Sequence, residues 1–164
     1  MDLLTERTKL IKYTTSDFES FCKVICNDEV MLHISGKGNS RKIARKKFNR
    51  LLKTNQKNRF YGIYKVILKE TNSVIGFAKM VPFEDDKIEI GYALLPDYWR
   101  LGYTNEMVKR MLKNGNQNFR NKKLIAIVNE ENIGSLKVLE NLNFHKYKKE
   151  PFKGSPCYFL EYIG

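Results

Sequence analysis

The stretch IEIGYALLPDYWRLGYTNEMVKRML, residues 88–112, decides the fold of this chain. It begins as a β-strand that ends near Leu95 and continues through a short loop containing Gly102. The helix predicted over residues 101–114 follows at once, with apolar residues at helical spacing: Met107, Val108, Met111 and Leu112. A helix start carries unpaired backbone N–H groups and the positive end of the helix dipole. Because Gly102 lets the backbone approach a ligand closely and Arg100 adds positive charge, this turn favours an anion.

Residues 127–147, IVNEENIGSLKVLENLNFHKY, hold a second informative pattern. The apolar run over residues 124–128 is typical of a buried strand, and a polar loop containing Asn132 follows it. A helix is predicted over residues 135–142. Asn132 and Ser135 are common helix-capping residues, and a capping role is compatible with a role in binding a ligand.

The remaining elements are predicted from hydrophobic periodicity and from turn residues. Further strands are expected over residues 8–13, 60–68, 74–81, 87–94, 144–147 and 158–163, and further helices over residues 16–26 and 40–55. A capping box is predicted from Ser16 to Glu19, His33 is expected in a loop, and Gly115 is expected to end its helix. The strands between residues 60 and 94 form an antiparallel meander, and the next crossover makes two strands parallel. The predicted fold class is α/β, of the α+β type.

The composition is that of one globular domain, because no linker, repeat or low-complexity tract divides the 164 residues. We therefore expect residues 1–164 to form a single domain. Three cysteines without CxxC spacing argue against a disulfide framework and against a zinc site. The sequence lacks the run of ~18 apolar residues that a membrane span needs, and its charged N-terminus is unlike a signal peptide. A soluble cytoplasmic protein is expected, with no membrane contact and no metal.

The charge is strongly basic, since 30 Lys and Arg against 18 Asp and Glu give a net charge of +12. Part of this excess fits the lysine-rich composition that an AT-rich genome produces, with the lysines exposed to solvent on the surface. The remainder favours a partner that carries phosphates or carboxylates. Residues 41–53 concentrate the charge on one predicted helix, whose basic face is interpreted first as solvated. The alternative interpretation is that this helix contacts RNA, an acidic protein or an acidic substrate.

Three motifs together resemble the GNAT superfamily of acyl-CoA N-acyltransferases, in particular its ribosomal-protein N-terminal acetyltransferases and spermidine acetyltransferases. They are LLTERTKLIKYTTSDFESF at residues 3–21, EIGYALLPDYWRLGYTNE at 89–106 and NEENIGSLKVLENLNF at 129–144. The motifs follow the family's order and span nearly the whole chain. The resemblance implies a mixed, mostly antiparallel sheet with flanking helices, whose central parallel strand pair splays to hold the cofactor. It implies acetyl-CoA as that cofactor, used as a cosubstrate without a metal.

The resemblance also implies the cofactor-binding residues: Leu94, Leu95, Arg100, Leu101, Gly102, Tyr103, Thr104, Asn105 and Asn132. The loop from Trp99 to Thr104 matches the superfamily's phosphate loop, with Trp99 in place of Gln or Arg and Thr104 in place of Gly or Ala. Its backbone amides would bind the diphosphate of coenzyme A. Leu94 and Leu95 would pair with the pantetheine arm and aim an N–H at the thioester oxygen. Asn132 would hydrogen-bond the same arm.

Two residues, Glu89 and Ser135, are candidates for proton transfer. An attacking amine must be neutral, although free amines have pKa values of ~8 to ~10.4, so a carboxylate that removes a proton would help. Glu89 is the candidate base, because it lies in mid-strand on the face opposite Ile88 and Ile90. The equal alternative for Glu89 is an ion pair with a lysine on the surface. Ser135 lies where some family members protonate the leaving thiolate, whereas Leu139 replaces the acid Tyr of many members, so Ser135 or another Tyr must serve.

The leading functional hypothesis is an acetyl-CoA-dependent N-acetyltransferase whose acceptor amine attacks the thioester directly. A protein N-terminus is the favoured acceptor. The first alternative is a small amine, such as a polyamine or an antibiotic, but a polycation needs an acidic pocket and only residues 84–86 and scattered carboxylates could form one. The second alternative is a non-catalytic acyl-CoA-binding or RNA-associated module, which the missing Tyr at Leu139 leaves open. A monomer and a homodimer are equally compatible with the sequence.

Overall fold

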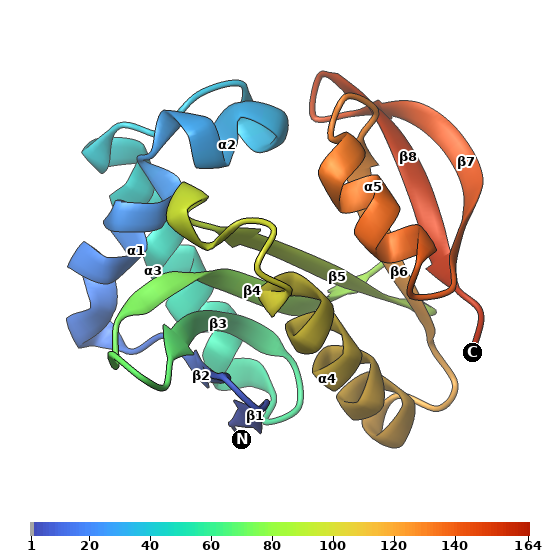
Figure 1. The fold of residues 1–164 in the computed structure, drawn as a ribbon, viewed down its shortest axis with the longest axis horizontal. Helices are drawn as coiled ribbons and strands as arrows, with labels where there is room; N and C mark the ends of the chain where they lie inside the picture. Colours follow the sequence, from blue (N-terminus) through green and yellow to red (C-terminus); the bar gives the residue numbers. More distant parts are fainter. Residues whose placement is uncertain (1) are drawn as a thin grey trace.

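Residues 2–164 are described by the computed structural model, and they form one eight-stranded sheet flanked by five α-helices (Figure 1). In spatial order the strands are β1-β2-β3-β4-β5-β6-β8-β7. Their bounds are β1 (Leu3–Leu4), β2 (Thr8–Lys12), β3 (Gly62–Leu68), β4 (Val74–Phe83), β5 (Lys87–Leu94), β6 (Lys123–Asn129), β7 (Phe144–Phe152) and β8 (Ser155–Tyr162). The helices are α1 (Phe18–Ile25), α2 (Asp28–Ser35), α3 (Arg41–Lys57), α4 (Tyr103–Asn118) and α5 (Ile133–Glu140).

The predicted antiparallel meander and the parallel strand pair are both confirmed. β3 pairs antiparallel with β4, and β4 pairs antiparallel with β5. The crossover through α4 brings β6 parallel to β5, but the two strands pair only along Lys87–Glu89 and Lys123–Ile125. Both strands continue beyond these residues without pairing with each other, so the sheet opens between them. The fold class is the expected one: a mixed, mostly antiparallel sheet whose central parallel pair diverges.

Helices cover both faces of the sheet, and each face has its own cluster of buried side chains (Figure 1). On one face, Met107 and Met111 of α4 and Leu136 of α5 pack against the strands. On the other face, α1, α2 and α3 pack around Phe21 and Phe48, whose ring centroids lie 5.3 Å apart. These two layers hold the diverging strands from both sides. Within residues 2–164, no helix is both long enough and apolar enough to cross a membrane.

α2 is a short helix that hydrophobic periodicity missed, so the prediction of His33 in a loop is wrong. Its two ends define it. The Asn27 side chain accepts a hydrogen bond from the Val30 N–H at 3.0 Å, and Gly36 ends the helix with a left-handed φ of 80°. Eight residues contain too few apolar repeats for a clear periodic signal, whereas the caps at both ends specify the helix.

Two other predictions of local structure are wrong. Gly115 lies inside α4 and does not end it. A Cβ at Gly115 would lie 2.6 Å from the Cδ1 of Leu124, so the glycine lets α4 pack closely against β6. The N-terminal capping interaction joins Thr14 and Asp17, not Ser16 and Glu19, since the Thr14 N–H donates to the Asp17 carboxylate at 2.8 Å. The spacing of a capping box occurs twice in this segment, and the observed box lies two residues before the predicted one, at the start of a short 3-10 helix (Thr15–Asp17) that leads into α1.

Candidate functional site

β5 and β6 part at the centre of the sheet, and this gap is the candidate site. Their last paired residues are Glu89 and Ile125. Further along β5, the Leu95 N–H donates to the Ile75 carbonyl of β4 at 2.8 Å. Because N–H groups alternate in direction along a strand, the Leu94 N–H points to the other side, into the gap. The N–H of Leu95 is therefore engaged in the sheet, and Leu94 is the residue that could offer an N–H to a ligand.

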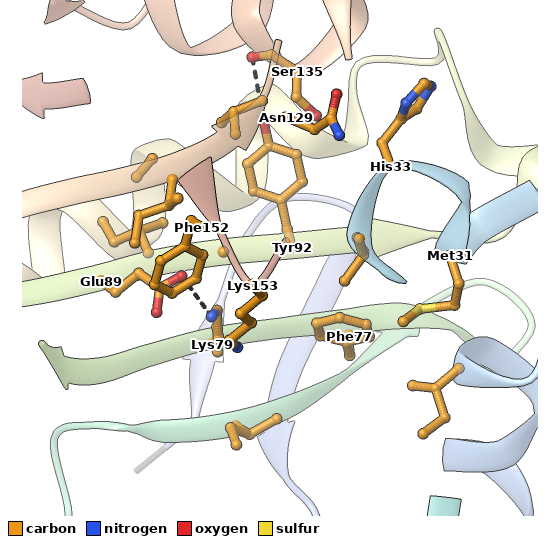
Figure 2. Close-up of a pocket in the computed structure, with 18 of the residues that line it drawn as sticks. Met31, His33, Phe77, Lys79, Glu89, Tyr92, Asn129, Ser135, Phe152 and Lys153 are labelled. Carbon is orange, nitrogen blue, oxygen red and sulfur yellow. Dashed lines mark hydrogen bonds and ion pairs between the residues drawn. The ribbon is translucent and has the colours of Figure 1, made fainter. Parts of the chain in front are cut away.

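Two hollows lie along this gap. The first, called here the sheet hollow, has a volume of about 380 Å³ and is bounded by strands β4 to β6, by α2 and α3, and by the β7–β8 turn (Figure 2). The second, called the turn hollow, has a volume of about 550 Å³ and lies between the end of β5, the loop before α4, α2 and the start of α5. Five residues line both hollows: His33, Ile34, Tyr92, Asn132 and Ser135. The two hollows therefore meet at the junction that these residues form.

The loop before α4 leaves main-chain donors free. Arg100 and Gly102 both have left-handed φ values, of 60° and 83°. The first helical hydrogen bond runs from the Glu106 N–H to the Gly102 carbonyl at 3.2 Å. No hydrogen bond within residues 2–164 uses the N–H groups of residues 103–105. Three adjacent free donors at the start of a helix fit an anionic group such as a diphosphate.

Arg7 makes long-range contacts with this loop and with α4 that sequence analysis missed. The Arg7 Nε lies 2.9 Å from a Glu106 carboxylate oxygen, and the Arg7 Nη1 donates to the Leu101 carbonyl at 3.0 Å. The guanidinium also lies over the Tyr103 ring, 4.3 Å from its centroid. Burial acts to raise the pKa of Glu106, but hydrogen bonds from Arg7 and Thr5 outweigh it and lower this pKa. Arg7 is 99 residues away from Glu106 along the chain, so no local motif could reveal the pair.

Trp99 closes the loop against the end of β5, because its Nε1 donates to the Leu94 carbonyl at 2.7 Å. Three of the expected cofactor-binding residues in this region line the turn hollow: Leu94, Arg100 and Thr104. Five other expected residues line neither hollow: Leu95, Leu101, Gly102, Tyr103 and Asn105. The Leu101 side chain is exposed (53%), and the contact of this residue with Arg7 is made by its carbonyl.

Glu89 faces the sheet hollow and is paired with Lys79 at the same time (Figure 2). Its Oε1 lies 2.6 Å from the Lys79 Nζ, and the residue is only 8% exposed. Lys79 stands opposite Gly91 in the sheet, and a Cβ at Gly91 would lie 2.5 Å from the Lys79 Cε. Gly91 therefore gives the lysine room to cross diagonally to Glu89. The two interpretations of Glu89, as a base and as an ion-paired residue, are compatible in space.

Tyr92 is the residue at the junction that sequence analysis left unnamed. Its hydroxyl donates to the Ser135 carbonyl across the gap at 3.5 Å (Figure 2). Burial raises the pKa of Tyr92 to about 12, so the phenol keeps its proton at neutral pH. Asn132 caps α5 by accepting a hydrogen bond from the Ser135 N–H at 3.1 Å. Leu139 is buried and lines the sheet hollow, which leaves Tyr92 and Ser135 as the hydroxyl groups at the junction.

The sheet hollow is basic. Among the described residues that line it, four are lysine or arginine and one is a carboxylate: Lys47, Arg50, Lys79 and Lys153 against Glu89. Lys47 and Arg50 belong to α3, so the basic helix borders this hollow with one edge. The acidic turn at residues 84–86 lines neither hollow. Within residues 2–164, no three side chains of His, Cys, Asp or Glu come together as a metal site would require.

Comparisons with known proteins agree with this architecture. A family model described as an acetyltransferase (GNAT) domain matches residues 7–145. The uncharacterized N-acetyltransferase p20 of Bacillus licheniformis is 30% identical over 151 residues, covering 88% of this chain and 82% of that relative. A GNAT-family acetyltransferase from Bacillus anthracis has the same fold, with a TM-score of 0.83 at 22% identity over 99% of this chain and 98% of the other. The structure of RimL, a ribosomal L7/L12 α-N-protein acetyltransferase solved with coenzyme A, has a TM-score of 0.83 at 13% identity. The match covers 99% of this chain and 98% of the other.

Proposed function

Because this chain belongs to the GNAT acetyltransferase family, we propose that it uses acetyl-CoA to acetylate a primary amine, which attacks the thioester directly. One observation carries the proposal. The turn hollow, with its free main-chain donors, meets the sheet hollow, with its buried carboxylate, at the junction around Tyr92. A cofactor held in the first hollow and an amine held in the second would face each other there.

The residues of the turn hollow suit coenzyme A. The N–H groups of residues 103–105, together with Arg100, would hold its diphosphate. The Leu94 N–H faces the gap and would stabilise the oxygen that becomes negative during the attack. The Asn132 side-chain oxygen is engaged in the cap, and its NH₂ group is the part that could donate to the pantetheine arm. When bound, acetyl-CoA supplies an acetyl group activated as a thioester.

Glu89 would remove the proton from the attacking amine, directly or through one water molecule. Its place in the sheet hollow supports this role, and so does its low exposure. The contact with Lys79 fixes the orientation of the carboxylate. Neither a metal nor a covalent enzyme intermediate takes part in this proposal.

Tyr92 would offer its proton to the departing thiolate, in the role that Leu139 cannot fill. Its hydroxyl lies at the junction, where the two hollows meet. Tyr92→Phe should lower kcat by about 10²-fold, the smaller end of the usual contribution of a positioned proton donor, and leave the KM for acetyl-CoA nearly unchanged. Ser135→Ala is the comparison, measured by steady-state kinetics. An unchanged kcat in Tyr92→Phe with a large loss in Ser135→Ala assigns the proton to Ser135.

The acceptor that we propose is a protein N-terminus. The lining of the sheet hollow supports this choice, because polycationic amines would meet a basic surface there. The fold shared with RimL, whose name gives a ribosomal-protein N-terminus as its acceptor, supports it as well.

Calorimetry with acetyl-CoA, followed by turnover assays, tests the proposal. We expect measurable heat of binding with acetyl-CoA and with coenzyme A, and acetylated product by mass spectrometry when peptides with free N-termini are added. Peptides with a blocked N-terminus serve as the control. Binding of acetyl-CoA without acetylation of any peptide, spermidine or aminoglycoside would point to a non-catalytic acyl-CoA-binding module.

A further inference from the structure

Three cations line the sheet hollow without a carboxylate partner. None of the ion pairs within residues 2–164 includes Lys47, Arg50 or Lys153. By contrast, Arg41 on the same helix is paired with Glu19 at 2.7 Å, although both side chains are well exposed. Among the described residues, Arg41 is the one cation of α3 with an ion pair, so Lys47 and Arg50 differ from the other unpaired cations of this helix in bordering the hollow.

The three cations come together from two distant parts of the chain. Lys47 and Arg50 lie on α3, and Lys153 lies at the tip of the β7–β8 hairpin. Burial lowers the pKa of Lys47, and repulsion from Lys153 and Arg50 lowers it further, so these charges act on one another. Figure 2 shows Lys153 directed into the hollow from above the sheet.

The hairpin turn that carries Lys153 is a tight one. Phe152 pairs with Ser155, which leaves Lys153 and Gly154 as a two-residue loop with φ values of 51° and 84°. Positive φ at both positions is typical of a type I′ turn, in which Asn, Asp or Gly is preferred at the first position. A lysine there costs conformational energy, and its side chain lines the hollow.

We propose that the acceptor is a protein N-terminus with acidic side chains in its first few residues, whose carboxylates bind Lys47, Arg50 and Lys153. This inference rests on the proposed function, since it names the acceptor of the same site. Lys79 is already neutralised by Glu89, so the remaining lining of the hollow carries an uncompensated positive charge. Carboxylates next to the acceptor amine would compensate it, whereas a polyamine would add to it.

The test compares two peptides that differ only in charge, one with Asp and Glu at positions two to four and one with Asn and Gln there. We expect kcat/KM to be about tenfold higher for the acidic peptide at low salt, and this ratio to fall as ionic strength rises. Spermidine should be the poorest acceptor. In the double variant Arg50→Gln/Lys153→Gln, the preference should fall toward one. Both residues are exposed, so circular dichroism should show the wild-type fold.

The control is Lys109→Gln/Lys113→Gln, which removes two exposed cations of α4 that line neither hollow. Its preference should stay at the wild-type value. An equal loss in both double variants, or no preference in the wild type, overturns the inference. Fluorescence anisotropy of the same labelled peptides separates the two proposals. Tighter binding of the acidic peptide without any turnover would sustain the acidic acceptor site and overturn the proposed acetylation.

Discussion

At the scale of single residues, the site depends on how each polar group is oriented more than on which groups are present. Glu89 has an ion-pair partner, yet it lines the hollow in which an acceptor amine would lie. Tyr92 and Ser135 come from different elements, and a hydrogen bond across the gap joins them. Asn132 both caps a helix and borders the two hollows. Such shared roles are common where a helix start also forms a binding site.

Glu89→Gln tests the base directly. We expect kcat to fall by about 10²- to 10³-fold, because the amide cannot accept the proton. The matched control is Glu161→Gln, because Glu161 is also a strand carboxylate paired with a lysine, Lys123 at 3.1 Å, and it lines neither hollow. A similar small loss in both variants would show that Glu89 only stabilises the fold.

At the scale of elements, the start of α4 and its support from β5 and the N-terminal segment form the proposed cofactor site. Gly102 makes the turn possible with a left-handed φ, and Arg7 packs behind it. Trp99 ties the same loop to β5. The two contacts join the loop to the N-terminal segment and to β5, and with the turn at Gly102 they fix the orientation of the N–H groups in the first helical turn.

Gly102→Ala should weaken acetyl-CoA binding by about tenfold or more. The substituted residue would be strained at a φ of 83°, and its Cβ would lie 3.3 Å from the Arg7 guanidinium, so the loop would shift. Calorimetry measures the dissociation constant. Gly36→Ala is the control, since Gly36 has a φ of 80° with open space around it. The two variants should lose similar stability, and an equal loss of acetyl-CoA affinity in both would contradict this account of the loop.

Gly115→Ala tests the contact between α4 and β6. Alanine favours a helix by about 1 kcal/mol over glycine, but the added methyl would press on Leu124, which is 3% exposed and cannot swing away. We expect a net loss of about 1–2 kcal/mol in the free energy of unfolding, measured with urea. Gly134→Ala within α5 is the comparison, because its nearest neighbour lies at 3.9 Å, and it should gain up to about 1 kcal/mol. A stabilised Gly115→Ala would show that the helix and strand are loosely packed.

At the scale of the whole molecule, two buried tyrosines, Tyr13 and Tyr64, and the partly buried Tyr92 make stability depend on alkaline pH. Burial raises the pKa of Tyr64 and of Tyr92 to about 12, and it raises the pKa of Tyr13 even more. In the unfolded chain these phenols ionise near pH ~10. Above that pH the unfolded state releases protons that the folded state retains, so unfolding is favoured as the pH rises.

The free energy of unfolding should therefore decline between pH 10 and pH 12, by up to about 1.4 kcal/mol per pH unit for each tyrosine. Urea denaturation over this range measures the slope. Tyr13→Phe should make the slope shallower. The Tyr13 hydroxyl is buried without a hydrogen-bond partner in the described chain, so its removal leaves no other group unsatisfied. An unchanged slope would mean that the pKa of Tyr13 is the same in the folded and unfolded states.

The amino-acid sequence predicted most of the fold because the decisive signals are local. β5 was predicted at its observed bounds, and the glycine turn leads into α4 as expected. The predictions for α2 and Gly115 were wrong for different reasons: α2 is too short for a periodic signal and is specified by its caps, whereas Gly115 serves the packing of α4 against Leu124 of β6. The site residues on the turn could be placed by motif, whereas Arg7 could not, because its partners lie about a hundred residues away.

The sequence alone predicted the order of the elements apart from α2, the glycine turn before α4 and the family resemblance, since each rests on residues that are close along the chain. Three features became visible in the folded chain alone: β5 and β6 part after Glu89, Tyr92 reaches Ser135, and Lys153 joins the cations of α3. These features depend on where distant strands end and on which side of the sheet a hairpin folds back. Such contacts are set by the packing of whole layers, which no local pattern encodes.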